Sequence, residues 1–255
     1  MRCAAPPKNC ASTWRPTARG NQTMETPTTP TPPKVASRRT LVVGDIHGCL
    51  DELQDLLRVA EVDSRTDRVI LVGDLVAKGP DSIGVVALAR ERGFGAVLGN
   101  HDAKVLKMGR NGGDRSPLVS PREHAYVAAH LAPADWDFLE GLPASLSLPD
   151  LNTIVVHAGL VPGVPLAQQE RRFLLNLRSI TPEGQPSKRV EDGAPWASLW
   201  KGPEHVVFGH DAVRGLQRHA NATGLDTGCV YGNALTGLIL PERRLVSVPA
   251  RRAYA

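Results

Sequence analysis

Apolar positions beyond Arg39 follow two alternating patterns along the chain. Short runs of β-branched and aliphatic residues at 40–43 and 68–72 predict buried strands, and each run ends at a Gly-Asp pair. Between these runs, leucine and alanine recur at helical spacing over 50–60 and predict an amphipathic helix. The chain therefore begins its folded part with a strand, a helix and a second strand.

The same alternation continues through the next thirty or so residues. Ser82 can cap a helix that runs to about Arg92, and the apolar segment 96–98 predicts a short third strand. A β-α-β-α-β order predicts a parallel sheet with right-handed crossovers. In such sheets ligands bind at the carboxyl ends of the strands.

The region after the third strand predicts helices and then irregular structure. Residues 103–143 have a mostly helical pattern, and residues 162–203 predict mixed loops and helices because Pro and Gly are frequent and periodicity is weak. We expect the helices of the first region to stop at its prolines, which are Pro117, Pro121, Pro133 and Pro143.

Further apolar runs predict strands in the second half of the chain. Residues 153–156 and 206–208 predict buried strands that each precede a histidine. Segments 224–226, 235–240 and 245–248 predict a second, more antiparallel set of strands. The chain has no internal repeat.

Five short motifs rich in Gly, Asp, Asn and His follow these predicted elements, and four of them come directly after an apolar run. They are Gly44-Asp45-Ile46-His47-Gly48, Gly73-Asp74-Leu75-Val76, Gly99-Asn100-His101-Asp102, Val156-His157-Ala158-Gly159 and Phe208-Gly209-His210. Each motif alone is weak, because a Gly-Asp at a strand end is usually a turn and an isolated histidine is usually structural. Five of them at one sheet edge predict a functional site.

The residue types of these motifs are those of a two-metal centre. Carboxylate and amide oxygens with imidazole nitrogens favour Mn, Fe or Zn over Ca, with Co or Mg as substitutes. Two metals a few ångströms apart need a bridging carboxylate, and Asp74 is the natural bridge. Asp45 and His47 are expected to face one metal. The other metal is expected to be held by Asn100, His157 and His210.

Charge divides the chain into two parts. Residues 1–40 hold seven Lys/Arg against one acid, Glu25, a net charge of +6, whereas the remaining residues hold 23 basic and 25 acidic side chains, a net charge of −2. The folded part is therefore not basic, which argues against a general nucleic-acid-binding module. Seven of the 21 prolines lie in residues 1–38. We expect a disordered, basic Pro/Thr-rich tail over 1–38 and a single domain over 39–255.

Compartment and partners are constrained only partly by the sequence. The four cysteines have neither zinc spacing nor a disulfide framework, which favours a reducing compartment, most simply the cytoplasm. No apolar run is long enough to span a bilayer, so we expect no membrane partner. The Arg-bearing tail leaves organelle targeting open, and Met24 is an alternative start. The oligomeric state does not follow from the sequence.

The motif series resembles the phosphoprotein-phosphatase branch of the calcineurin-like metallophosphoesterases over about residues 39–249. Residues 44–48 match that family's Gly-Asp-x-His-Gly, and 99–102 match its Gly-Asn-His-Glu with Asp102 in place of Glu. The resemblance implies a β-sandwich flanked by helices, in a four-layer α-β-β-α arrangement within one domain. It also implies a hydrolase with two divalent metals, in which His101 is the general acid for the leaving oxygen.

One departure from the family pattern bears on the substrate. The second motif, Gly-Asp-x-Val-Asp-Arg-Gly in the protein phosphatases, reads Gly-Asp-Leu-Val-Ala-Lys-Gly at 73–79. Ala77 therefore stands where those enzymes have the aspartate that orients the acid histidine. In its absence, either Asp102 or a substrate phosphate is expected to hold His101. Ala77, Lys78 and Asp102 resemble the ApaH-like and symmetrical diadenosine-tetraphosphatase branch.

This branch implies substrates that contain phosphate chains. We expect hydrolysis of dinucleoside polyphosphates or inorganic polyphosphate, with RNA as a partner only if capped RNA is the substrate. Lys78 is the main candidate for a phosphate contact, followed by the weaker candidates Arg178, Lys201 and Arg214, and a solvated surface charge is the alternative for each. Two other functions stay open, a protein Ser/Thr phosphatase and a non-catalytic metal-binding interaction module.

Overall fold

The computed structural model describes residues 38–109 and 122–255. The predicted tail therefore lies outside the described residues, except for Arg38. The Nε atom of Arg38 donates a hydrogen bond to the carbonyl oxygen of Thr66 over 2.7 Å, so this residue contacts the folded domain. The prolines at 117 and 121 also lie outside the described residues.

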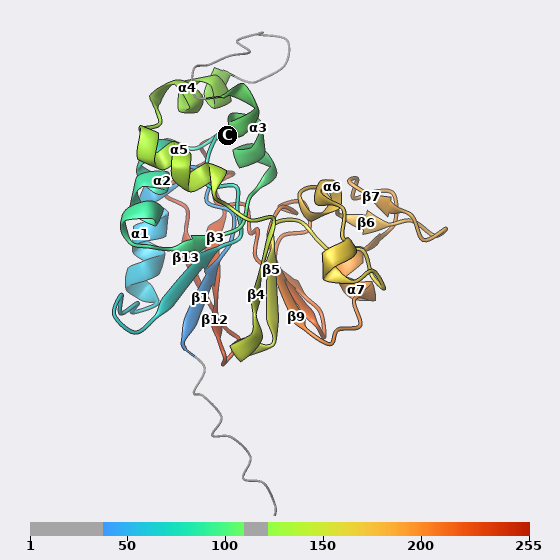
Figure 1. Ribbon diagram of the computed structural model, residues 1–255. Coiled ribbons are helices and arrows are strands. Elements are labelled where there is room, and N and C mark those ends of the chain that lie inside the picture. The colour runs from blue at the N-terminus through green and yellow to red at the C-terminus, as the bar shows by residue number, and fades with distance from the viewer. Residues whose placement is uncertain (1–37, 110–121) are drawn as a thin grey trace, which may run out of the picture. The chain divides into compact units, whose positions relative to one another are not determined.

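The first sheet has five strands in the order β13-β12-β1-β2-β3 (Figure 1). Its parallel half, β1 to β3, has the predicted direction, and β12 and β13 add to it in antiparallel fashion. The strands are β1 Thr40–Val43, β2 Arg68–Leu71, β3 Gly95–Ala96, β12 Ala234–Leu240 and β13 Arg244–Pro249. The third strand thus begins one residue before its predicted start.

The second sheet also has five strands, in the order β10-β11-β9-β5-β4. Strands β5, β9 and β11 are parallel to one another, while β4 and β10 pair antiparallel at the two edges. The strands are β4 Ser145–Leu148, β5 Thr153–Val156, β9 His205–Phe208, β10 Gln217–Arg218 and β11 Ala222–Gly224.

The predicted second set of antiparallel strands is corrected in two respects. Strands β12 and β13 are antiparallel as predicted, but they extend the first sheet rather than forming a second one. The strand predicted at 224–226 lies two residues earlier, as β11, and it pairs in parallel with β9. Strand β4, with the alternating sequence Ser-Leu-Ser-Leu, was not predicted. Hydrophobic pattern indicates that a segment is a strand, but its partner depends on contacts distant in sequence.

Helices cover the outer face of each sheet (Figure 1). Against the first sheet lie α1 Leu50–Val59, α2 Ser82–Glu91, α3 Asn100–Met108, α4 Arg122–His130 and α5 Pro133–Glu140. Against the second lie α6 Arg171–Leu174, α7 Trp196–Leu199, a short 3₁₀ helix at Leu166–Gln168, and a small sheet of β6 Ser179–Ile180, β7 Pro186–Ser187 and β8 Ala194–Pro195. A second 3₁₀ helix, Pro149–Leu151, joins β4 to β5. Among the described residues, none of these helices is long and apolar enough to cross a membrane.

The structure corrects one predicted helix boundary and refines another. Asp81, rather than Ser82, caps α2, because its side chain accepts a hydrogen bond from the backbone N–H of Gly84 over 2.7 Å. Pro133 lies at a break between two helices as predicted, because α4 ends at His130, and Pro133 itself begins α5. Proline suits the first helical turn, where its missing N–H would have no partner within the helix.

Three clusters of buried apolar side chains separate four layers. Along β1, Leu41 and Val43 pack toward the helices while Val42 packs between the sheets. Along β5, Val155 packs between the sheets and Ile154 packs with the helices on the other side. Successive side chains point to opposite faces of each strand, and both faces are buried. The result is the predicted α-β-β-α arrangement.

Candidate metal centre and active site

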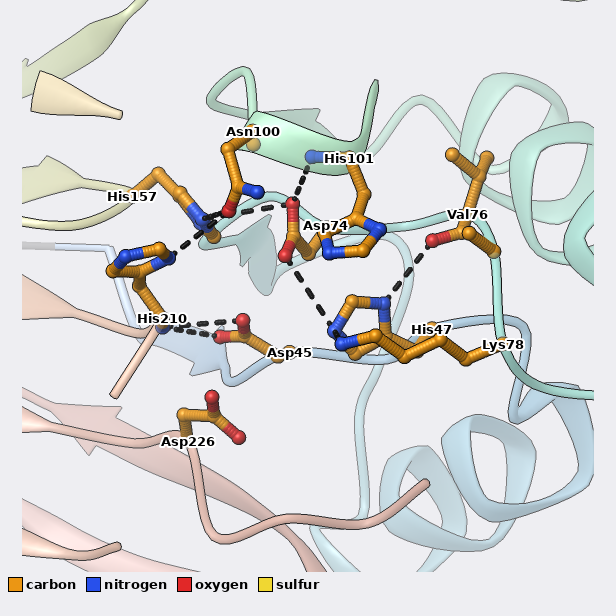
Figure 2. A network of polar contacts seen from close by, with 12 residues as sticks. Asp45, His47, Asp74, Val76, Lys78, Asn100, His101, His157, His210 and Asp226 are labelled. Carbon is orange, nitrogen blue, oxygen red and sulfur yellow. Dashed lines mark hydrogen bonds and ion pairs between the residues drawn. The ribbon is translucent and has the colours of Figure 1, made fainter. Parts of the chain in front are cut away.

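The carboxyl ends of the parallel strands of both sheets meet at one cluster of polar side chains (Figure 2). Each predicted metal ligand comes from a loop directly after one of these strands, or from the start of the helix that follows it. The six are Asp45 and His47 after β1, Asp74 after β2, Asn100 at the start of α3, His157 after β5 and His210 after β9. The structure therefore brings together six residues that span 165 positions of the chain.

Asp74 lies at the centre of this cluster, with one carboxylate oxygen toward each side. Its Oδ2 lies 3.5 Å from Nε2 of His47, and its Oδ1 lies 3.5 Å from Nε2 of His157. Asp74 is also the residue shared by two groups of side chains that could each hold a metal ion. A carboxylate placed in this way can bridge two ions.

Hydrogen bonds to the backbone orient two of the histidines. The Nδ1 of His47 contacts the carbonyl oxygen of Val76 over 3.1 Å, and the Nδ1 of His157 contacts that of Val72 over 2.9 Å. A carbonyl can only accept, so each Nδ1 carries the proton and each Nε2 presents a lone pair. This is the arrangement that metal-binding histidines usually have.

The side-chain oxygen of Asn100 lies between the rings of His157 and His210. This atom, Oδ1, lies 3.0 Å from Nε2 of His157 and 3.0 Å from Nδ1 of His210. The Nε2 of His210 is buried and has no hydrogen-bond partner in the described part of the chain. A buried imidazole nitrogen without a partner is costly unless a ligand satisfies it.

The electrostatics of the cluster favour bound cations. Burial raises the pKa of Asp45 well above its usual value, and the charges of Asp226 and Asp74 raise it further. Burial likewise raises the pKa of Asp74 to about 6. Burial lowers the pKa of His47 to about 3 and that of His157 to about 4, so both rings are neutral, as metal ligation requires. The donor set therefore fits two divalent metals.

Backbone conformation at the cluster is strained in the way that functional sites often are. His47, Asp74 and His210 have φ angles of 48°, 49° and 68°, in the left-handed region that costs a non-glycine residue roughly 1–3 kcal/mol. Gly99 and Gly209 sit against the cluster, and a Cβ added at either would overlap a carboxylate oxygen of Asp74 or Asp45. Glycine is therefore required beside these ligands.

His101, the predicted acid, lies beside the cluster and is held by another histidine. Its Nδ1 lies 3.0 Å from Nε2 of His124 in α4, and the two rings stack with centroids 5.0 Å apart. His124 is 1% exposed. Sequence reasoning missed His124 because it lies in no motif. The helical spacing of His124, Val127 and Leu131, which all face inward, is the signal that indicates its burial.

Asp102 does not contact the ring of His101, which corrects the expectation that Asp102 orients it. Its Oδ1 accepts hydrogen bonds from the backbone N–H groups of Leu75 and Val76, and its Oδ2 accepts from that of Gly99. Asp102 therefore ties the loop after β2 to the start of α3. Burial raises its pKa to about 7, and the charge of Asp74 contributes to the rise.

Asp226 is a further acidic residue at the cluster that the predicted ligand set omits. It is 6% exposed and lies beside Asp45 in Figure 2. Its Oδ1 accepts a hydrogen bond from the backbone N–H of Gly228 over 3.1 Å. Burial raises its pKa to about 6. The Gly-Leu-Asp-Thr-Gly stretch around it was the available signal in the sequence.

Two of the predicted phosphate contacts lie at the cluster. The Nζ of Lys78 is 3.1 Å from Nε2 of His47 and donates to the hydroxyl of Tyr231 over 2.9 Å. The guanidinium of Arg178 donates to the carbonyl oxygen of His210 over 2.9 Å. Both cations are therefore close enough to contact a substrate that is bound at the metal centre.

Two other candidate cations are placed differently. Lys201 is exposed and lies just before β9, whereas His210 follows the opposite end of that strand, so the structure does not bring Lys201 to the cluster. Arg214 is engaged structurally, because its guanidinium donates to the carboxylate of Asp211 and to the carbonyl oxygen of Val190. The structure therefore places Lys78 and Arg178, rather than these two cations, beside the metal centre.

Comparison with known proteins identifies the family. The family model for calcineurin-like phosphoesterases matches residues 38–236. The chain belongs to this family. It is similar to the asymmetrical bis(5'-nucleosyl)-tetraphosphatase PrpE of Oceanobacillus iheyensis, with 29% identity over 84% of the chain and 93% of that protein. It is also similar to a symmetrical bis(5'-nucleosyl)-tetraphosphatase of Edwardsiella ictaluri, with 30% identity over 84% of the chain and 97% of that protein.

Solved structures agree with the family assignment. A crystal structure of a candidate diadenosine tetraphosphatase is 41% identical and superposes with a TM-score of 0.77, covering 85% of the chain and 95% of that protein. A protein serine/threonine phosphatase from Saccharomyces cerevisiae is 14% identical with a TM-score of 0.52, over 86% of the chain and 81% of that protein. The second likeness is one of fold alone. The calcineurin-like phosphoesterases are hydrolases with a two-metal centre, and the cluster described above contains two groups of side chains that could each hold a metal ion.

Proposed function

We propose that the protein hydrolyses phosphoanhydride bonds of dinucleoside polyphosphates or polyphosphate at this centre. The observation that carries the proposal is the position of Asp74, with one oxygen toward His47 and the other toward His157. Asp45 and His47 would hold one ion, Asn100, His157 and His210 would hold the other, and Asp74 would contact both. Mn, Fe or Zn suits these ligands, with Co or Mg as substitutes.

The bound metals would supply Lewis-acid activation of water and of the phosphoryl oxygens. The chain itself supplies charge and a proton. Lys78 and Arg178 are placed to bind non-reacting phosphate oxygens at the two sides of the centre. The Nδ1 atom of His101 contacts His124. The other ring nitrogen of His101, Nε2, would therefore donate a proton to the leaving oxygen.

In this proposal His124 is a positioning residue. It substitutes for the aspartate that the protein phosphatases have at the position of Ala77, which is a buried alanine here. A neutral histidine holds the ring of His101 in place but stabilises its positive charge less than a carboxylate does. This favours leaving groups that need little protonation, such as the phosphates released from an anhydride.

The relatives support the same substrate class but differ in where they cut. One is named an asymmetrical and another a symmetrical tetraphosphatase, at nearly the same identity. The bond that this chain cleaves is therefore a separate question from its substrate class. Analysis of products from diadenosine tetraphosphate separates the two outcomes, because symmetrical cleavage gives only ADP and asymmetrical cleavage gives ATP and AMP.

One panel of substrates tests the proposal. Metal-loaded protein is assayed with diadenosine tetraphosphate, polyphosphate, para-nitrophenyl phosphate and a phosphoserine peptide, each with Mn, Co, Zn or Mg. We expect kcat/KM to be higher for an anhydride than for the peptide. A peptide preferred over every anhydride would support the protein Ser/Thr phosphatase alternative, and no turnover of any substrate would support a non-catalytic metal-binding module.

The cytoplasm remains our proposal for the compartment. It is supported by the free thiols of Cys49 and Cys229, both buried, which suit a reducing environment.

A further inference from the structure

A cavity of about 540 Å³ opens beside the metal centre, between α3 and α6. It begins at Asn100, whose Oδ1 contacts two histidines of the centre. Among the described residues, its wall carries four cationic side chains and no carboxylate. The four are Lys104 and Lys107 of α3 and Arg171 and Arg172 of α6. We call this space the α3–α6 cavity.

The lysines of α3 form a row that leads away from the centre. Asn100, Lys104 and Lys107 are separated by four and three positions, so they lie along one face of the helix. At 1.5 Å per residue, Lys104 and Lys107 lie roughly 6 and 10 Å along the helix axis from Asn100. A row of this kind presents successive positive charges to a ligand that extends out of the metal centre.

Most of this charge is not neutralised by the protein. Arg172 pairs with Glu170 over 2.9 Å. Lys104, Lys107 and Arg171 have no ion pair with any residue in the described ranges, 38–109 and 122–255. All three side chains are exposed.

A second cavity has a lining of mixed charge. It has a volume of about 560 Å³, and its lining includes Lys78 as well as Asp81, Glu123 and the exposed ring of Tyr126. Its carboxylates would repel phosphate. Of these two cavities, the α3–α6 cavity has the larger excess of positive charge and therefore suits a chain of negative charges better.

We propose that the α3–α6 cavity is a subsite for the phosphates of a linear phosphoanhydride chain that lie beyond the phosphate under attack. This rests on the proposed function and deepens it, because it assigns residues to chain recognition. Adjacent phosphates of an anhydride each carry negative charge, so they match adjacent cations. A phosphate monoester has no further phosphate to place there, and it gains nothing from these residues.

The test compares substrates with different numbers of phosphates. In the variant Lys104→Gln/Lys107→Gln, KM for tripolyphosphate and diadenosine tetraphosphate should rise about tenfold, since each exposed ion pair contributes up to about fivefold. The KM for para-nitrophenyl phosphate should change less than about twofold. Adding Arg171→Gln should increase the effect on the longer substrates further.

A matched control removes the same charge elsewhere. Arg243 and Arg244 are exposed at the turn between β12 and β13, at the opposite end of β1 from His47. The variant Arg243→Gln/Arg244→Gln should leave every KM unchanged. An equal rise in the control, or an equal rise for para-nitrophenyl phosphate, would overturn the subsite because the effect would then be one of net charge or of the centre itself.

A binding measurement separates this proposal from the proposed function. Calorimetry on chelator-treated protein measures the affinity for tripolyphosphate without turnover. Weaker binding in Lys104→Gln/Lys107→Gln, with the control unchanged, supports the subsite even if the wild-type enzyme cleaves no anhydride. Unchanged binding in this variant overturns the subsite even if anhydrides are cleaved. The subsite is also overturned if single-stranded RNA competes for binding more strongly than tripolyphosphate does.

Discussion

The Nδ1 atom of His101 and the Nε2 atom of His124 lie 3.0 Å apart, and the planes of the two rings are inclined by 21°. His124 belongs to α4 and is 23 residues away in sequence. Its own Nδ1 is buried and has no hydrogen-bond partner in the described ranges. His124 thus makes one polar contact through its ring, and that contact is with the proposed acid.

The variant His124→Ala should lower kcat more than it raises KM, because it frees the ring of His101 without removing a phosphate contact. We expect a loss of about tenfold to a hundredfold, smaller than the 10²–10⁴-fold typical of losing a general acid. His124→Gln should recover part of the loss, because its amide nitrogen can take the place of Nε2 and still contact Nδ1 of His101. Circular dichroism of both variants checks that α4 remains folded.

Coupling between the two histidines gives a sharper measurement. His101→Ala should keep both metals and slow turnover by 10²–10⁴-fold, with a smaller loss for substrates whose leaving group needs little protonation. The double variant His101→Ala/His124→Ala should be no slower than His101→Ala, since His124 acts through His101. Additive losses would contradict the positioning role, and equal losses for good and poor leaving groups would indicate that His101 is a ligand or a structural residue.

Asp74→Asn should abolish metal loading and activity together. Asp74 faces both sides of the centre, so losing its charge weakens both sites at once. The metal content of the purified variant, measured by elemental analysis, tests this expectation. Two full equivalents of metal in Asp74→Asn would contradict the bridging role.

Removal of residues 1–37 should leave kcat and the melting temperature nearly unchanged. The segment is rich in Pro and Thr and has Trp14 as its one aromatic residue, so it has little apolar surface to pack. Arg38 should be retained because it contacts the loop before β2. A melting temperature lowered by several degrees would show that the segment contributes to the fold.

His205 should make the fold sensitive to acid. It is 3% exposed at the start of β9, and burial, aided by Arg243, lowers its pKa to about 4. The unfolded chain therefore binds this proton at a higher pH than the folded chain does. Stability is fully present above about pH 6.5 and falls as the pH drops toward 4, by at most about 3 kcal/mol.

The variant His205→Gln isolates this effect. Glutamine can keep a hydrogen bond to the hydroxyl of Thr223, which now contacts Nε2 of His205 over 3.0 Å. The difference in unfolding free energy between wild type and variant should depend on pH between 6.5 and 4. Parallel curves over this range would contradict the assignment.

The sequence by itself determined the local elements and the chemistry of the centre. Strand β1 and helix α1 follow directly from periodicity, because the alternation of Leu41, Val42 and Val43 and the helical spacing of Leu53 and Leu56 reflect burial that local geometry imposes. The six ligand candidates could be recognised because glycine, carboxylate and imidazole recur at predicted strand ends.

Tertiary structure decided what depends on contacts between distant segments. Strands β12 and β13 join the first sheet, and β11 joins the second, because sheet partners are chosen by complementary faces rather than by local pattern. The same holds for His124, which approaches His101 only because α4 packs against α3. Packing therefore decides what Asp102 and His124 contact, and that Lys201 lies away from the centre. A local sequence pattern does not encode such contacts.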